Sequence, residues 1–93
     1  MNVIIETIMH QINWKALYFN GFEFIQMSDQ ALRVHKGKKN LDITYNPGTD
    51  LYDLSEHTIQ PDLTVKTRKI EGVFCDQLQD IIAEFFNIGK VRA

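Results

Sequence analysis

The sequence predicts a single α+β domain with two layers: an antiparallel meander of four to five strands, covered on one face by an N-terminal and a C-terminal helix. Apolar residues recur at helical spacing near both ends, whereas the central part alternates apolar and polar residues with the period of a strand. The expected strands are joined by short connections, which favours antiparallel pairing of neighbours. A chain of 93 residues suffices for one modest core, so we expect residues 1–93 to form one domain.

Composition and charge restrict the classes of function. The hydrophobic fraction of 44% indicates a packed globule, and the net charge of −2 disfavours nucleic-acid binding, which usually requires a strongly basic domain. The single cysteine, Cys75, excludes an intrachain disulfide and favours a reducing, cytoplasmic compartment. We see no signal peptide and no run of roughly 18 to 20 apolar residues, so we expect a soluble protein without membrane contact.

The first helix is expected over residues 2–17. Its apolar residues lie at steps of three and four, which places them on one helix face; they are Ile4, Ile5, Ile8, Met9, Ile12 and Ala16. Gly21 marks the point where this pattern has ended. Trp14, Tyr18 and Phe19 make the junction rich in aromatic residues. Most of these rings should pack in the core, and any ring left exposed would indicate a protein interface.

The central residues 22–68 contain the expected strands, FEFIQM, ALRVHK, LDITY, LYDLS and LTVKTR. Leu32 and Val34 alternate with Arg33 and His35, so one face of the sheet is apolar and the other is polar. The apolar face therefore requires cover from the two helices.

The stretch NPGTDLYD, residues 46–53, joins two of these strands, and its Pro-Gly pair has the chemistry of a type II turn. A four-residue loop would pair Tyr45 with Asp50, and the same register would place Asp42 directly opposite Asp53. Two close carboxylates can bind a divalent metal or share a proton, which would support a metal-dependent hydrolase.

The favoured interpretation of this carboxylate pair is structural. Lys66 or Arg68, on the next strand, would neutralise Asp42 and Asp53 on a solvated face, and the stretch would only complete a hairpin. His57 is the nearest further metal ligand, but no recognised ligand spacing is present. The sequence therefore predicts no enzyme, and it indicates no catalytic residue, no metal and no cofactor.

The last helix is expected over residues 72–88. Its apolar stripe consists of Phe74, Leu78, Ile81, Ile82 and Phe85. Gly89 fits a left-handed C-terminal stop, and Lys90 and Arg92 would lie near the negative end of the helix dipole.

Acidic residues follow the opposite side of this helix, because Asp76, Asp80 and Glu84 lie at successive four-residue steps. They form either a docking surface for a basic partner or an ordinary solvated face. Together with Asp50 and Asp53, they are our candidate partner-binding residues.

Basic residues concentrate in RVHKGKK and KTRK. An alternative function is therefore a nucleic-acid-binding module, with phosphate contacts from Arg33, Lys36, Lys38, Lys39, Lys66 and Arg68. The basic hairpin could also meet the acidic helix of another copy in a homodimer, or could simply keep the sheet edges soluble.

The strand DLYDL and the later helix EGVFCDQLQDIIAEFF resemble a group of small proteins encoded by bacteriophages and related mobile elements. In that group an Asp-Leu-Tyr-Asp strand follows a stretch similar to VHKGKKNLDITYNPG and precedes a basic strand and an acidic helix. The likeness covers residues 20–86, and the chain departs from the pattern at SEHTIQPD and FNIGKVRA. The resemblance implies a phage or prophage accessory protein without known catalytic residues. We therefore expect it to bind, and to inhibit, a host protein, for example a nucleic-acid-guided nuclease in an anti-CRISPR role.

Overall fold

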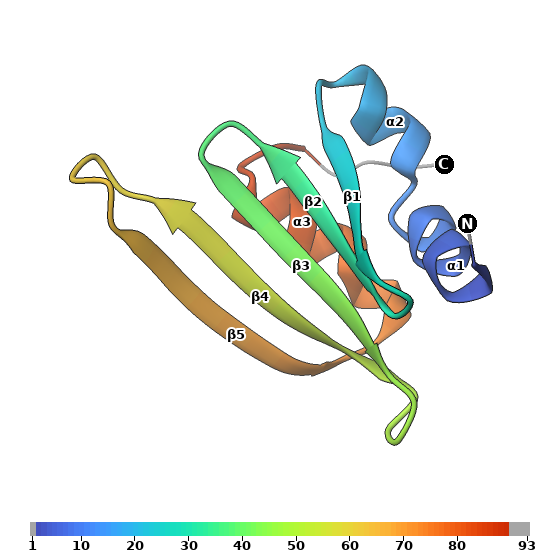
Figure 1. Ribbon diagram of the computed structural model, residues 1–93. Coiled ribbons are helices and arrows are strands. Elements are labelled where there is room, and N and C mark those ends of the chain that lie inside the picture. Colours follow the sequence, from blue (N-terminus) through green and yellow to red (C-terminus); the bar gives the residue numbers. More distant parts are fainter. Residues whose placement is uncertain (1, 90–93) are drawn as a thin grey trace.

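The computed structural model describes residues 2–89. Its elements are α1 (Val3–Gln11), α2 (Trp14–Phe19), β1 (Glu23–Ser28), β2 (Ala31–Lys36), β3 (Lys39–Asn46), β4 (Leu51–Ile59), β5 (Val65–Val73), the 3-10 turn η1 (Cys75–Gln77) and α3 (Leu78–Phe85). The strands form one antiparallel sheet in the order β1-β2-β3-β4-β5 (Figure 1). This confirms the predicted α+β meander. No helix within residues 2–89 is long and apolar enough to cross a membrane.

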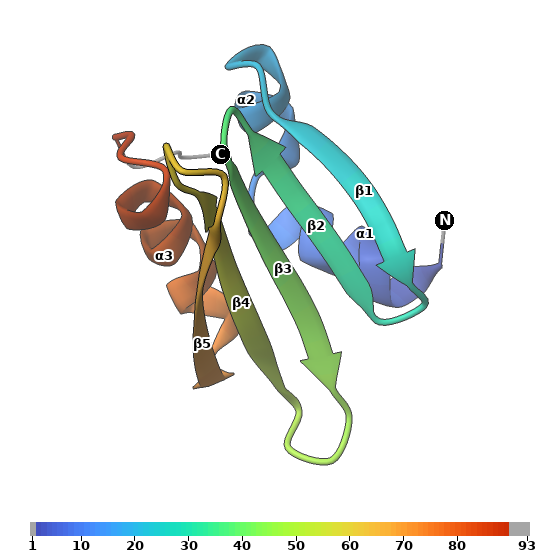
Figure 2. The same cartoon turned by 60° about the vertical axis from the view of Figure 1, so that its left-hand side comes forward.

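The core lies between the sheet and the three helices, all of which pack on the same sheet face (Figure 2). The predicted alternation is confirmed: Leu32 and Val34 are buried, whereas Arg33 and His35 lie on the face that no helix covers. The fully buried side chains include Ile5, Ile8, Ile12, Leu17, Phe22, Leu41, Ile43, Leu54, Leu78 and Ile82. The helices thus protect one face, and the other remains an open polar surface.

The N-terminal helix is interrupted, so the prediction of one helix over residues 2–17 is wrong. α1 ends at Gln11, and Asn13 adopts the left-handed conformation with φ 57° before α2 begins at Trp14. Asparagine enters this conformation more readily than most residues with a side chain. Tertiary packing stabilises the interruption, because Ile12 and Leu17 on either side of it are both fully buried.

The β3–β4 hairpin has a register two residues away from the predicted one. Tyr45 lies opposite Tyr52, and Asp42 lies opposite Ser55, not Asp53. A shift of two residues keeps every side chain on its face, so the apolar alternation could not distinguish the two registers.

The turn of this hairpin explains the shift. Its left-handed residue is Asp50, with φ 57°, and not Gly48, so the predicted type II turn is wrong. The backbone N–H of Asp50 donates to the carbonyl of Asn46 at 2.8 Å, and the loop again has four residues but lies one position further along the chain, at residues 47–50, with Asn46 opposite Leu51.

The C-terminal helix is shorter than residues 72–88 at both ends. β5 continues to Val73, which pairs with Tyr52, and α3 begins only after η1. At the other end Asn87 takes the left-handed conformation with φ 56°, and the N–H of Ile88 donates to the carbonyl of Ala83 at 2.9 Å. This is a Schellman stop, so Asn87 has the role predicted for Gly89. Lys90 and Arg92 lie outside the described residues.

Candidate functional site

One end of the sheet collects acidic side chains from segments that are far apart in the sequence. This end comprises the β1–β2 turn, the β3–β4 hairpin, the end of β5 and the start of α3 (Figure 1). Its carboxylates are Asp29, Asp50, Asp53, Glu71, Asp76 and Asp80. The corresponding segments, residues 28–31, 44–54 and 70–80, contain no lysine or arginine. We refer to this surface as the acidic end.

Four of the five residues predicted to bind a partner lie at the acidic end: Asp50, Asp53, Asp76 and Asp80. Asp76 in η1 and Asp80 in α3 are both exposed, and the opposite side of α3 is buried against the core. Asp53 accepts a hydrogen bond from the backbone N–H of Gly72 at 3.2 Å, which connects the hairpin to the end of β5. The chain thus joins residues that the sequence separates by more than twenty positions into one surface.

The fifth predicted residue, Glu84, lies away from the acidic end. It borders a small groove of about 360 Å³ together with Lys39, Lys66, Arg68 and Glu56. The hydrogen bond from Arg68 to Glu56 raises the pKa of Arg68, and the nearby charge of Glu84 raises it further. Glu84 therefore compensates basic charge within the protein.

A larger groove of about 590 Å³ opens at the acidic end, between α1, the β3–β4 hairpin and η1. It is lined by Val3, Ile4, Thr7, Gln11, Tyr45, Thr49, Asp50, Leu51, Tyr52, Phe74 and Cys75. Val3 is 77% exposed and Phe74 is 58% exposed, so apolar surface is available on both walls. A groove with apolar walls, two phenol rings and a carboxylate suits the apolar stem and charged head of an arginine or lysine side chain.

Two tyrosines fix the shape of this groove. The hydroxyl of Tyr45 donates to Asp50 Oδ1 at 2.5 Å, and that of Tyr52 donates to Gln11 Oε1 at 2.6 Å. Their rings meet edge to face with centroids 5.8 Å apart. The hydrogen bond to Asp50 raises the pKa of Tyr45 above its ordinary value of 10.0, and burial raises the pKa of Tyr52. Both phenols are thus protonated at neutral pH. The bond from Tyr52 to Gln11 connects the hairpin to α1, whereas the bond from Tyr45 to Asp50 lies within the hairpin.

Replacing Asp50 with asparagine should lower the pKa of Tyr45 toward 10.0, because the charged acceptor is lost while the left-handed backbone is retained. The raised pKa means that the Tyr45–Asp50 contact is fully present below pH 10.0 and is lost as the pH rises through the folded-state pKa. An NMR titration of labelled tyrosine rings measures this, with Asp53→Asn as control. An unchanged Tyr45 pKa in Asp50→Asn would contradict the assigned contact.

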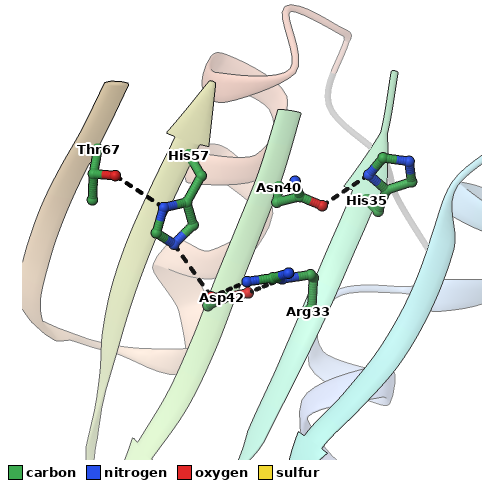
Figure 3. A network of polar contacts seen from close by, with 6 residues as sticks. All are labelled: Arg33, His35, Asn40, Asp42, His57 and Thr67. Atoms are coloured by element: carbon green, nitrogen blue, oxygen red, sulfur yellow. Dashed lines mark hydrogen bonds and ion pairs between the residues drawn. The ribbon is translucent and has the colours of Figure 1, made fainter. Parts of the chain in front are cut away.

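The open face of the sheet carries a cross-strand polar network (Figure 3). Arg33 donates from Nε to Asp42 Oδ1 at 2.7 Å and from Nη2 to Oδ2 at 3.0 Å. His57 Nε2 lies 3.3 Å from Asp42 Oδ2, and its Nδ1 lies 3.0 Å from Thr67 Oγ1. The network joins β2, β3, β4 and β5, and on the same face His35 Nδ1 lies 2.8 Å from Asn40 Oδ1.

This network corrects two predictions about Asp42. It does not pair with Asp53, and its charge is neutralised by Arg33, not by Lys66 or Arg68. The physical cause is the register shift, which places Thr44 opposite Asp53. Within residues 2–89, no three histidine, cysteine, aspartate or glutamate side chains are placed to hold a metal ion. The proposed hydrolase centre at the carboxylate pair is therefore not formed.

The order hydroxyl, imidazole, carboxylate in this network also occurs in hydrolase triads. Here, however, Thr67, His57 and Asp42 lie on an open strand face, and none of them lines either groove described above. Arg33 engages both oxygens of Asp42. We therefore interpret the network as a link between strands.

The residues predicted to bind phosphate are largely engaged within the protein. Arg33 is on the open face, whereas Lys39 donates to the carbonyl of Phe85 at the C-terminal end of α3, at 2.5 Å. Arg68 donates to the buried Glu56 at 2.7 Å. The ammonium group of Lys36 lies over the ring of Phe22. Lys38 lies in the turn between β2 and β3, and Lys66 lies near the start of β5. Because Glu56 and Glu84 lie among them, they do not form a continuous basic surface.

The groove at the acidic end was missed by the sequence reasoning. Its signal was present, because a register shifted by two residues places the two tyrosines of the hairpin opposite each other. The predicted turn type excluded that register.

No protein-family model, curated protein or solved structure matches the chain. The resemblance to phage-encoded proteins therefore stays a prediction. The candidate functional site rests on the chemistry and placement of its own residues: the carboxylates of the acidic end and the groove beside them.

Proposed function

We propose that this protein acts stoichiometrically, by binding a basic surface of a host protein through the acidic end and blocking the site where that protein holds an anionic ligand. The supporting observation is that three separate segments contribute carboxylates to one surface without a single lysine or arginine. Surfaces that bind nucleic acids are rich in lysine and arginine, so fixed carboxylates complement them. With the phage resemblance, the sharpest form is inhibition of a nucleic-acid-guided nuclease.

The groove supplies the anchor for this interaction. Exposed charge pairs are worth roughly 0.2–1 kcal/mol each, so surface carboxylates alone chiefly speed association. A partner side chain that enters the groove would be removed from water between Phe74 and the hairpin, with the Asp50 carboxylate available for its charge. Such enclosed anchors contribute most of the affinity in protein interfaces.

The acidic end is also preorganised. Tyr45 holds Asp50, and Asp53 is held by the N–H of Gly72 and by Asn46 Nδ2 at 3.3 Å. Side chains that are already ordered lose little conformational entropy on binding. The two hairpin carboxylates are therefore presented at fixed positions.

Reversing the charge of Asp76 and Asp80 together tests the proposal. We expect Asp76→Lys/Asp80→Lys to reduce capture of the partner from bacterial lysate at least about tenfold, because attraction becomes repulsion. The matched control is Glu23→Lys/Asp62→Lys, which changes the net charge equally at exposed positions outside the acidic end. Thermal unfolding of both variants verifies that the fold is retained.

The identified partner is then titrated with the purified chain in a nucleic-acid-binding assay. We expect its nucleic-acid binding to fall to zero at an equimolar amount of the chain and to be unaffected by the acidic-end variant. Equal capture by both charge-reversed variants, or undiminished nucleic-acid binding by the partner, would refute the proposal. Direct, salt-sensitive binding of nucleic acid by the chain itself would instead favour Lys36, Lys38 and Lys66 as a phosphate-binding set.

A further inference from the structure

The β4–β5 hairpin ends in an exposed apolar residue that is held in an unusual backbone conformation. Leu63 adopts the left-handed conformation with φ 70° and is 82% exposed. Leucine rarely takes this conformation, so the turn presents Leu63 to solvent at a cost in conformational energy. Ile59 and Val65, which pair with each other at the base of the turn, are 37% and 57% exposed. The hairpin thus ends in a projecting apolar surface that takes no part in the core.

Two lysines lie beside this apolar surface. The backbone carbonyl of Lys38 accepts a hydrogen bond from the N–H of Ile59 at 2.9 Å, and Lys66 pairs with Thr58 on β4. Both lysines are exposed, and within residues 2–89 neither ammonium group makes a hydrogen bond or an ion pair. We refer to the surface formed by Lys38, Ile59, Leu63, Val65 and Lys66 as the tip.

The tip and the acidic end lie at opposite ends of the sheet and carry opposite charge (Figure 1). The segments around the tip, residues 35–40 and 57–68, contain five lysine and arginine residues and one carboxylate, that of Asp62. Glu56, which is buried, and Glu84 offset two of these positive charges. The acidic end has six carboxylates and no lysine or arginine. One end of the molecule is therefore electrostatically complementary to the other.

We propose that the tip of one copy of this chain enters the groove at the acidic end of a second copy. The groove has apolar walls at Val3 and Phe74, which suit Leu63. Oδ2 of Asp50, which Tyr45 does not engage, can accept a hydrogen bond from the ammonium group of Lys66. An apolar side chain enclosed in a groove supplies affinity, while the opposite charges around it orient the approach and disfavour contact between two like ends.

Such a contact is heterologous, because it joins two different surfaces. The copies at either end of an assembly keep a free tip or a free acidic end, so association continues into open chains unless the rotation between copies closes a ring. Within these chains the tip of the next copy covers the acidic end. Self-association and host-protein binding therefore compete for the acidic end. Only this competition rests on the proposed function, because self-association needs no host protein.

Sedimentation velocity of the purified chain tests self-association without a host protein. We expect oligomers that grow with protein concentration and dissociate as the salt concentration rises, because salt screens the opposite charges. Leu63→Asn/Lys66→Glu should raise the dissociation constant at least about tenfold. Asparagine accepts the left-handed conformation, so the hairpin is retained. The matched control, Phe19→Asn/Lys15→Glu, makes the same changes at exposed positions on α2, outside both surfaces, and should leave association unchanged.

A mixing experiment distinguishes this contact from a symmetric dimer. Asp76→Lys/Asp80→Lys alters the acidic end and keeps the tip, whereas Leu63→Asn/Lys66→Glu alters the tip and keeps the groove. Each variant alone should be monomeric at concentrations where the unaltered chain associates, because neither variant offers both surfaces. An equimolar mixture should form a dimer with one copy of each variant and grow no further, since one intact tip meets one intact groove.

Four outcomes would overturn the proposal: an unaltered chain that stays monomeric up to about 1 mM, association that persists in Leu63→Asn/Lys66→Glu, equal weakening by the control, or a variant mixture that stays monomeric. Should the double tip variant fail to fold, Lys66→Glu alone provides the same test at an exposed side chain. None of these outcomes changes the result expected for capture from bacterial lysate, so a failure here is separate from a failure of the proposed function.

Discussion

Replacing Ile82 with alanine should lower the free energy of unfolding by about 2–5 kcal/mol. Ile82 is 1% exposed on the inner face of α3 and belongs to the core beneath the sheet. The loss combines the transfer free energy of the deleted methyl groups with the cavity that remains. Because a domain of this kind is stable by roughly 5–15 kcal/mol, this single change removes a large part of its stability.

Urea denaturation measures this loss, with Val3→Ala as the control, because Val3 is 77% exposed on α1. The control substitution should lower the free energy of unfolding by less than about 0.5 kcal/mol. In both variants the slope of the free energy of unfolding against urea concentration should be unchanged. A loss in Ile82→Ala as small as that of the control would show that α3 is not packed on the sheet. The placement of Asp76 and Asp80 on the outer surface would then lose its physical basis.

Replacing Asp42 with leucine should lower the free energy of unfolding by about 1–3 kcal/mol, because the partly buried guanidinium of Arg33 then lacks its carboxylate partner. The side chains of Arg33 and Asp42 are 30% and 20% exposed, so solvent screens this pair only in part. The same substitution removes the contact between Asp42 and His57. An Asp29→Leu control, at an exposed turn, should cost less than about 0.5 kcal/mol.

A double-mutant cycle separates this pair from its surroundings. When Arg33→Met accompanies Asp42→Leu, no charge is left unpaired, and the loss should be smaller than the sum of the single losses by about 1 kcal/mol. Urea denaturation of the two single variants and of the double variant gives the coupling free energy between Arg33 and Asp42. A coupling near zero would show that the network in Figure 3 does not stabilise the sheet.

The sequence alone determined the fold class and the faces of the sheet, because these follow from periodicity. A period of two identifies strands, and steps of three and four identify helices, wherever the exact boundaries lie. The alternation of Leu32 and Val34 with Arg33 and His35 thus gave the correct buried face. The same alternation does not determine the pairing register of two strands, because a register shift of two residues leaves every side chain on its original face.

Only the tertiary structure decided the register, the helix boundaries and the composition of the site. The loop closed by Asn46 and the left-handed Asp50 selected the register, and burial of Leu17 favoured the break at Asn13. Asp76 and Asp80 were recognisable from helical spacing, but their meeting with Asp50 depends on how β5 returns beside the hairpin. Local spacing is a property of the chain, whereas the proximity of distant segments is created by the packing of the sheet against its helices.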